Sequence, residues 1–234
     1  MEKESINNNP TLWDAVDDQQ TVKVSFLNAR SIRNKFDSIQ NDSSLLKSNL
    51  IILAETWLEN NNGSPVLKNY ETNLCGGGRG QGIATFSKES FTIDGYRDRE
   101  NINMIKVKHA LFNIIGVYTS QKANPLNIIE NLAPMIEITR PTVIMGDFNI
   151  CLRRNKNNPL TNFLTTAGFK QLVKEATHIE VIGISKVKSN IICFQGGLID
   201  HVYILNIPEE HIILQLIQKY FSDHDALYLT FKSM

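Results

Sequence analysis

The segment at positions 142–149 constrains the fold more than any other part of the sequence. It reads Thr-Val-Ile-Met-Gly-Asp-Phe-Asn, and its apolar start with β-branched residues, between a proline and a glycine, predicts a buried strand. Alternation along an extended backbone would send Asp147 and Asn149 to the same side, with Phe148 in the core. Two polar side chains at the mouth of a buried strand indicate a site. A strand that ends in an Asx turn has the same sequence pattern.

The rest of the chain alternates between segments with the apolar pattern of a strand and segments with that of a helix. Further strands are predicted at 22–28, 50–54, 83–87, 104–108, 111–118, 197–204 and 225–231, and helices at 31–47, 125–138 and 159–167. Helices interspersed with strands, some of them paired as hairpins, favour mixed sheets over a purely parallel wound sheet. We therefore expect two packed sheets with helices outside.

Length and composition predict one globular domain of 21–234 behind a polar tail at 1–20. The tail is rich in asparagine and shows neither sustained periodicity nor the apolar stretch of a secretory signal. No window has the apolar length needed to cross a bilayer, so we expect no membrane partner. Three cysteines without metal-ligand spacing are typical of a reducing, intracellular compartment.

The charge balance argues against strong nonspecific phosphate binding as the main purpose of the chain, although it leaves room for a local basic surface. Lysine plus arginine number 24, as do aspartate plus glutamate, so the formal net charge is zero, whereas such binders usually show a basic excess. A glycine-rich segment at 76–82 lacks the Gly-Lys-Ser/Thr ending and leads into a strand rather than a helix. A nucleotide-binding P-loop is therefore not expected there.

Polar side chains recur where the predicted strands end. They are Asn28, Glu55, Tyr118, Asp147, Asn149, Asp200, Asp223 and His224. The set offers oxygen ligands for a hard divalent cation, an imidazole and a phenol, but no thiolate cluster and no paired histidines. These donors favour Mg²⁺ or Mn²⁺ over zinc. Taken singly, each residue is equally typical of a cap, a turn or a packing position.

Six stretches in this order resemble the endonuclease/exonuclease/phosphatase superfamily. They are Phe26-Leu27-Asn28, Ala54-Glu55-Thr56-Trp57-Leu58, Gly116-Val117-Tyr118, Gly146-Asp147-Phe148-Asn149, Leu198-Ile199-Asp200-His201-Val202 and Phe221-Ser222-Asp223-His224. More closely, positions 27–35 and 55–58 look like the apurinic-type endonuclease domains of non-LTR retrotransposons. Positions 176–179 and 196–203 are similar to endonucleases of helitron-related elements. The resemblance spans about residues 22 to 232.

The resemblance implies a DNase I-like fold, a four-layer α/β/β/α sandwich with two mixed sheets. It implies a divalent-metal-dependent DNA endonuclease that nicks one strand and leaves a 3'-hydroxyl, as in target-site nicking by a mobile element. A phosphatase of the same fold and a catalytically silent DNA-binding domain are the alternatives. The implied partners are DNA and the reverse transcriptase, or another region, of a larger mobile-element protein. We expect a monomer in the nucleus.

The resemblance also assigns roles on the metal and water side of the reaction. Glu55 would be the principal metal ligand, with Asn28 beside it. Asp147 would orient or deprotonate the attacking water, and Asn149 would hold that water or the developing charge.

On the phosphate side, His224 would contact the scissile group, with Asp200 as the carboxylate that fixes its ring. Tyr118 would hydrogen-bond the phosphate, and Asp223 would assist metal binding or water positioning. The residues implied to contact DNA are Thr177, Ser222 and Arg30. The histidines His178 and His201 are assigned to structural or surface positions, and Trp57 and Phe148 to packing.

Two features depart from the family pattern. Abasic-site repair enzymes have a second acidic residue two positions after the first asparagine, where this chain has Arg30. That difference favours a retrotransposon-style nickase over a repair enzyme. In addition, positions 181–195 form an insertion in an otherwise tight connection, within a loop where related enzymes often touch DNA, so it could alter DNA binding.

Overall fold

The computed structural model describes residues 21–58, 64–88, 90–155, 157–184 and 192–232. The predicted tail at 1–20 lies outside the described residues, so the division into tail and domain stays a prediction. Among the described residues, every helix is too short or too polar to cross a membrane.

The first of two six-stranded sheets contains both ends of the described chain. Its strands run in the order β13-β14-β1-β2-β4-β3. They are β1 (Val22–Asn28), β2 (Leu50–Ala54), β3 (Glu71–Cys75), β4 (Ile83–Ser87), β13 (Ile212–Gln218) and β14 (Asp225–Phe231). Strands β1 and β2 pair in parallel, with Asn28 opposite Ala54, so their carboxyl ends share one edge of the sheet.

The second sheet contains the strand predicted within positions 142–149. Its order is β5-β6-β7-β8-β12-β9. The strands are β5 (Thr92–Arg99), β6 (Ile102–Lys108), β7 (Asn113–Thr119), β8 (Thr142–Asp147), β9 (Lys170–Gln171) and β12 (Asp200–Leu205). Strand β8 pairs in parallel with β7 and antiparallel with β12. Its last residue, Asp147, therefore lies between Tyr118 and Asp200.

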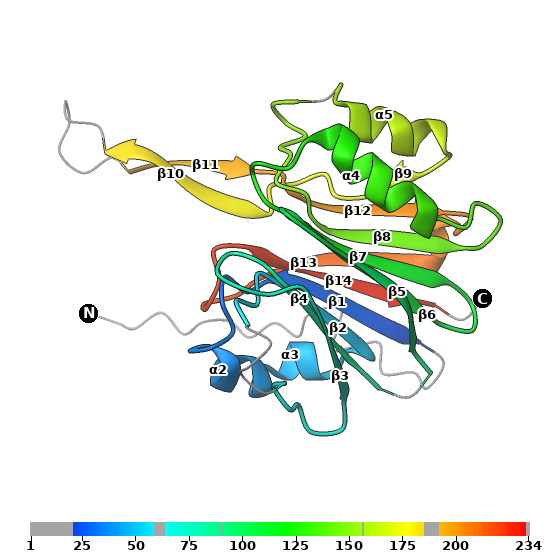
Figure 1. Ribbon diagram of the computed structural model, residues 1–234. Coiled ribbons are helices and arrows are strands. Elements are labelled where there is room, and N and C mark those ends of the chain that lie inside the picture. Colours follow the sequence, from blue (N-terminus) through cyan, green and yellow to red (C-terminus); the bar gives the residue numbers. More distant parts are fainter. Residues whose placement is uncertain (1–20, 59–63, 89, 156, 185–191, 233–234) are drawn as a thin grey trace.

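Helices cover the outer face of each sheet, which gives the four-layer sandwich that the sequence predicted (Figure 1). Helices α2 (Phe36–Gln40) and α3 (Ser43–Leu46) lie on the first sheet. Helix α4 (Pro125–Leu132), followed by the 3-10 turn η1 (Ala133–Met135), and helix α5 (Pro159–Thr166) lie on the second. A further 3-10 turn, η2 (Glu209–His211), precedes β13.

The alternation of β8 shows how the layers are held together. Val143 and Met145 join the core between the sheets, where Val24 and Phe26 of β1 also lie. Ile144 points the other way and joins the cluster beneath α4 and α5. Strand β8 is therefore buried on both faces, as its apolar run indicated.

Several predicted boundaries were wrong for identifiable reasons. The helix predicted at 31–47 is two short helices, because the Asp42 side chain accepts hydrogen bonds from the Ser44 and Leu45 amides and starts a new helix. The helix predicted at 125–138 ends in the 3-10 turn that contains Pro134. The strand predicted at 197–204 starts only at Asp200. Strands β3, β5, β9 and β13 were not predicted, nor were the two strands at 178–184 and 192–197.

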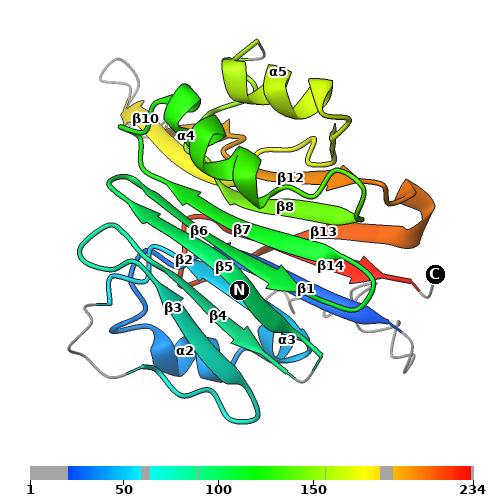
Figure 2. The ribbon, with the colours of Figure 1, turned by 45° about the vertical axis from the view of Figure 1, so that its right-hand side comes forward.

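A two-stranded antiparallel ribbon projects from one end of the sandwich (Figures 1 and 2). It consists of β10 (His178–Ile184) and β11 (Ile192–Gly197) and contains most of the segment predicted as an insertion at 181–195. Residues 185–191 lie outside the described residues, and the assignment of an insertion stays a prediction. The ribbon begins at His178, beside the ends of the sheets.

Gly146 allows β7 and β8 to approach each other. A Cβ at this position would lie 1.9 Å from the carbonyl oxygen of Val117, a distance at which the two strands would have to separate. The glycine before Asp147 is thus required by strand packing.

We expect Gly146→Ala to lower the free energy of unfolding by at least about 1–3 kcal/mol, the usual cost of overpacking a core. Gly95→Ala is the matched control, because a Cβ on Gly95 has no described neighbour within 4 Å. Urea unfolding followed by circular dichroism measures both. Equal midpoints for the two variants would contradict the packing argument.

Candidate active site

The two parallel strand pairs bring polar residues from both sheets to one end of the sandwich. Asn28 ends β1 and is fully buried. Glu55 follows β2 with a φ of 50°, in the left-handed region that turns the chain sharply. Asp147 ends β8 in the opposite sheet and is also buried.

The Asn28 amide group joins these two carboxylates. Its Nδ2 donates to Glu55 Oε1 at 2.9 Å and to Asp147 Oδ2 at 2.8 Å. Its Oδ1 accepts the backbone N–H of Arg30 at 3.0 Å, which fixes the orientation of the amide. In this geometry Asn28 holds Glu55 and Asp147 together, and its part as a metal ligand stays a prediction.

Burial and the negative charge of Asp200 hold the pKa of Asp147 well above its usual range, although the charge of His224 opposes them. Asn149 donates its backbone N–H to Asp147 Oδ1 at 2.9 Å and its Nδ2 to the carbonyl of Thr119 at 2.6 Å. Asn149 has a φ of 50° and lies beyond the end of β8. An Asx turn, rather than strand alternation, therefore places it beside Asp147, while Phe148 is buried as expected.

Asp200 and His224 form a second contact between the sheets. Asp200 starts β12, and its Oδ2 lies 2.9 Å from Nδ1 of His224, the residue before β14. Burial alone would lower the pKa of His224, but the charge and hydrogen bond of Asp200, with the charges of Asp147 and Asp223, raise it to about 9. His224 is therefore an imidazolium at neutral pH in this structure.

Two hydroxyl groups position this pair. The Ser222 hydroxyl donates to the carbonyl of Asn28 at 2.7 Å and accepts the backbone N–H of His224 at 3.1 Å. The Thr177 hydroxyl is buried and accepts the backbone N–H of Asp200 at 3.1 Å. Both hydroxyls make contacts inside the protein, and their contacts with DNA stay predictions.

His178 was missed by the sequence reasoning. Its Nε2 lies 3.1 Å from Asp223 Oδ2, and its backbone forms a β-bridge with His224. The same Asp223 oxygen pairs with Arg30 at 2.6 Å. Burial raises the pKa of Asp223, but the hydrogen bond of His178 and the charges of His224 and Arg30 lower it to about 2. The Thr-His-Ile stretch before the predicted insertion was the only sequence signal for His178.

His201, in contrast, is a packing residue. It is fully buried, stacks on Phe148 with ring centroids 4.9 Å apart, and places Nε2 2.9 Å from the carbonyl of Ile150. Burial lowers the pKa of His201 to about 4, so the ring is neutral.

The glycine-rich loop closes one side of the site. The Tyr118 hydroxyl donates to the carbonyl of Gly80 at 2.7 Å. Burial and the charges of Glu55 and Asp147 raise the pKa of Tyr118, so its phenol is neutral. Trp57, expected only to pack, donates its Nε1 to Glu55 Oε2 at 3.3 Å and carries the Arg79 guanidinium 5.8 Å from its ring centroid.

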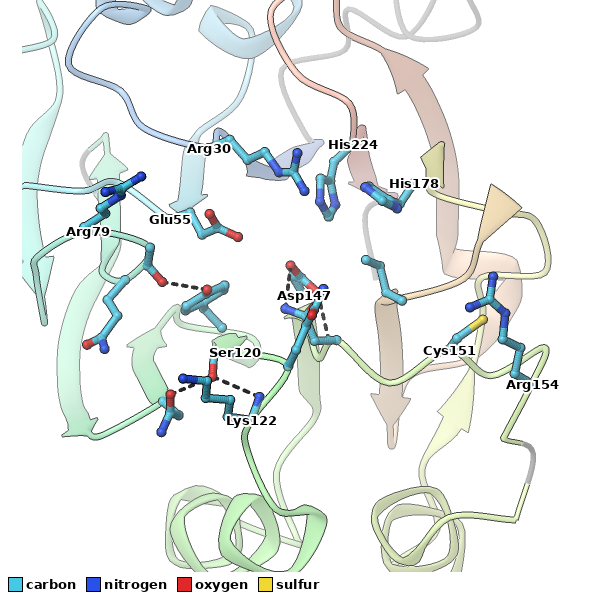
Figure 3. A pocket seen from close by; sticks show the side chains of 17 residues that line it. Arg30, Glu55, Arg79, Ser120, Lys122, Asp147, Cys151, Arg154, His178 and His224 are labelled. Carbon is cyan, nitrogen blue, oxygen red and sulfur yellow. Dashed lines mark hydrogen bonds between the residues drawn. The ribbon is translucent and has the colours of Figure 1, made fainter. Parts of the chain in front are cut away.

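A cavity of about 750 Å³ lies between these elements (Figure 3). Six predicted residues line it: Arg30, Glu55, Tyr118, Asp147, Asn149 and His224. Five others lie behind this lining: Asn28, Thr177, Asp200, Ser222 and Asp223. Sequence reasoning missed further lining residues, among them Arg79, Lys122, Cys151, Arg154 and His178.

The donors fit a divalent cation. Glu55 and Asp147 are two carboxylates held side by side by one amide group and facing the cavity, which is the oxygen environment that hard cations prefer. Asp147, Asp200 and His224 also bring one ligand atom each to within 4.8 Å of one another, as do His178, Asp223 and His224.

Several known structures have a similar fold. An AP endonuclease from Archaeoglobus fulgidus matches with a TM-score of 0.69 and 17% identity, over 90% of this chain and 99% of that one. The 3'-5' exonuclease NExo from Neisseria meningitidis matches with a TM-score of 0.68 and 16% identity, over 90% and 100%. The endonuclease domain of TRAS1, a telomere-specific non-LTR retrotransposon, matches with a TM-score of 0.62 and 10% identity, over 91% and 99%.

These neighbours are proteins of the endonuclease/exonuclease/phosphatase fold, and the chain has that DNase I-like fold. No family model matches the sequence, and no curated protein matches it. At these identities the likeness establishes the architecture alone.

We expect Asn28→Asp to destabilise the protein by at least about 2 kcal/mol, because a buried carboxylate replaces the donor that the carboxylates of Glu55 and Asp147 share. The loss should shrink as pH falls, since protonation of one carboxylate removes the repulsion. Thermal unfolding across a pH series measures it, with the exposed Asn127→Asp on α4 as control. A loss independent of pH, or one equal to the control, would contradict the bridging role of Asn28.

Proposed function

We propose that this chain is a divalent-metal-dependent DNA endonuclease that nicks one strand by phosphodiester hydrolysis and leaves a 3'-hydroxyl. One observation carries the proposal. The paired carboxylates of Glu55 and Asp147 line the same cavity as the imidazolium of His224, so negatively and positively charged side chains face one space (Figure 3). The nuclease names of structural neighbours support it.

Glu55 would hold the cation, Mg²⁺ or Mn²⁺, with both its oxygens fixed by Asn28 and Trp57. A bound ion would stabilise negative charge on the phosphate oxygens and lower the pKa of a bound water. Asn28 would act as a positioning residue for Glu55 and Asp147, beyond its proposed place beside the metal.

Asp147 would accept the proton of the attacking water. Its raised pKa makes the carboxylate a stronger base than an exposed aspartate, which suits a general base. Asn149 would keep Asp147 oriented through its backbone N–H and would contact the water or the developing charge.

Two donors beside the carboxylates, His224 and Tyr118, would stabilise the phosphate. Asp200 holds Nδ1 of His224, which leaves Nε2 as the ring nitrogen that can donate to a phosphate oxygen. Tyr118 has a neutral phenol at the cavity, and its hydroxyl would turn from the carbonyl of Gly80 to donate to the phosphate. Donors fixed before the reaction stabilise a developing charge without reorganisation. Asp223 would position His178 and Arg30.

Cationic side chains would bind the flanking DNA backbone. Arg30, Arg79, Lys122 and Arg154 all line the cavity, so a chain of zero net charge presents a local basic surface. Thr177 and Ser222 would act on DNA through the loops that they fix, in addition to any direct contact.

The proposal predicts that the protein converts supercoiled plasmid to open circles in the presence of Mg²⁺, and that EDTA abolishes the reaction. Glu55→Gln, Asp147→Ala and His224→Ala should each lower the rate by at least about 100-fold, the usual effect of removing one transition-state contact. Glu130→Gln, at an exposed position, and His211→Ala, at a half-buried position on η2, are controls that should nick like the parent. Polymerase extension from the nick without phosphatase treatment tests the 3'-hydroxyl.

Other outcomes point to the alternatives. Release of inorganic phosphate from DNA 3'-ends without nicking would favour a phosphatase, and one similar structure is a 3' phosphatase from Neisseria bound to a product DNA hairpin. Gel shifts without product, unchanged in the three site variants, would favour a silent DNA-binding domain.

The biological setting is also part of the proposal. The motifs shared with retrotransposon endonucleases and the fold shared with the TRAS1 domain support target-site nicking for a mobile element, with a reverse transcriptase or another region of a larger protein as partner. A DNA substrate makes the nucleus the expected location. The monomeric state stays a prediction.

A further inference from the structure

Two imidazoles that line the cavity meet the carboxylate of Asp223. The rings of His178 and His224 have centroids 4.6 Å apart, and Figure 3 shows the two side chains next to each other. Asp223 lies against them, and the three residues bring one ligand atom each to within 4.8 Å of one another. Neighbouring histidines were not foreseen from the sequence, because His178 and His224 meet only through the β-bridge.

We propose that His178, Asp223 and His224 form a second metal site, selective for Zn²⁺ or a similar transition ion. Imidazole nitrogen is a ligand for zinc, cobalt and nickel, whereas Mg²⁺ takes oxygen. The donor set therefore differs in kind from the carboxylate pair of Glu55 and Asp147. Two ions of different chemistry would bind in one cavity, at adjacent sites, because His224 also has a ligand atom within 4.8 Å of one on Asp147.

The hydrogen bond of Asp200 supports this assignment. A histidine that binds a metal usually gives its other ring nitrogen to a carboxylate, which fixes the ring. Asp200 Oδ2 lies 2.9 Å from His224 Nδ1, so Nε2 is the nitrogen left for an ion. Three protein ligands would leave a position open toward the cavity, as in zinc sites that exchange ligands.

Arg30 opposes the second site. Its guanidinium lies 2.6 Å from Asp223 Oδ2, and its side chain is half exposed. An entering cation would have to displace this guanidinium from Asp223 and would be repelled by its charge. The site should therefore bind a transition ion only moderately in the parent protein and more tightly without Arg30.

Binding would have a regulatory consequence, which rests on the proposed function. An ion on Nε2 of His224 releases the proton from that nitrogen and removes the donor proposed to contact the phosphate. Zn²⁺ would then inhibit the Mg²⁺-supported reaction.

The direct test is titration of the metal-free full chain with Co²⁺, followed by visible absorption, and with Zn²⁺ by calorimetry. We expect one equivalent to bind with a Co²⁺ spectrum of nitrogen and oxygen ligands. His178→Asn should weaken binding at least tenfold, and Arg30→Gln should tighten it severalfold. His211→Asn, a histidine on η2, and Glu55→Gln should bind within twofold of the parent.

Several results would overturn the site. These are equal binding by the parent and His178→Asn, a larger loss in Glu55→Gln than in His178→Asn, or an intense thiolate band that points to a cysteine ligand. Asp223→Asn is the second ligand variant. Circular dichroism shows whether each variant is folded, and if His178→Asn is not, Asp223→Asn decides in the same way.

The activity test compares each protein with its own Mg²⁺-only rate. Zn²⁺ at concentrations near its dissociation constant for the parent should inhibit the parent, whereas Arg30→Gln should be inhibited at a lower concentration and His178→Asn should require at least tenfold more metal. Equal sensitivity of all three would contradict the site. If the protein has no nicking activity, the proposed function fails, and the Co²⁺ titration alone decides the metal site.

Discussion

One buried amide group is the interaction on which the site depends. Asn28 belongs to the first sheet, and its Nδ2 reaches both Glu55, at the end of that sheet, and Asp147, in the second sheet. Two carboxylates this close repel each other, and a shared donor offsets the repulsion without adding charge. The distance between the carboxylates is therefore fixed by the packing of one sheet on the other.

The contact between Asp200 and His224 also joins the two sheets. Asp200 starts a strand of the second sheet, and His224 precedes a strand of the first, so their hydrogen bond also crosses the sandwich. Ser222 ties the His224 loop back to the carbonyl of Asn28. Residues of both sheets thus take part in each of the two contacts. Two packed sheets can therefore hold opposite charges around one cavity. The loops add the cationic side chains that line it.

The strands that were predicted from the sequence are those in which burial gives a clear pattern of apolar residues. The central strands β1, β2, β4, β7 and β8 were predicted because their apolar residues face a core on both sides. The edge strands β3 and β5 were missed because they are half exposed and polar, so their sequences lack that pattern. The polar residues at strand ends could be predicted because each of them directly follows or precedes an apolar strand. The place of His178 in the site could not be predicted, because a β-bridge between distant segments of the chain brings it there.

The central claim is that Glu55 and Asp147, from different sheets, act on one substrate group. A double-mutant cycle on the single-turnover nicking rate tests it most directly, with Glu55→Gln, Asp147→Ala and the double variant. Residues that act as a unit give strongly non-additive effects. The account predicts that the double variant is little slower than the slower single variant. Losses that multiply, as for independent residues, would contradict it.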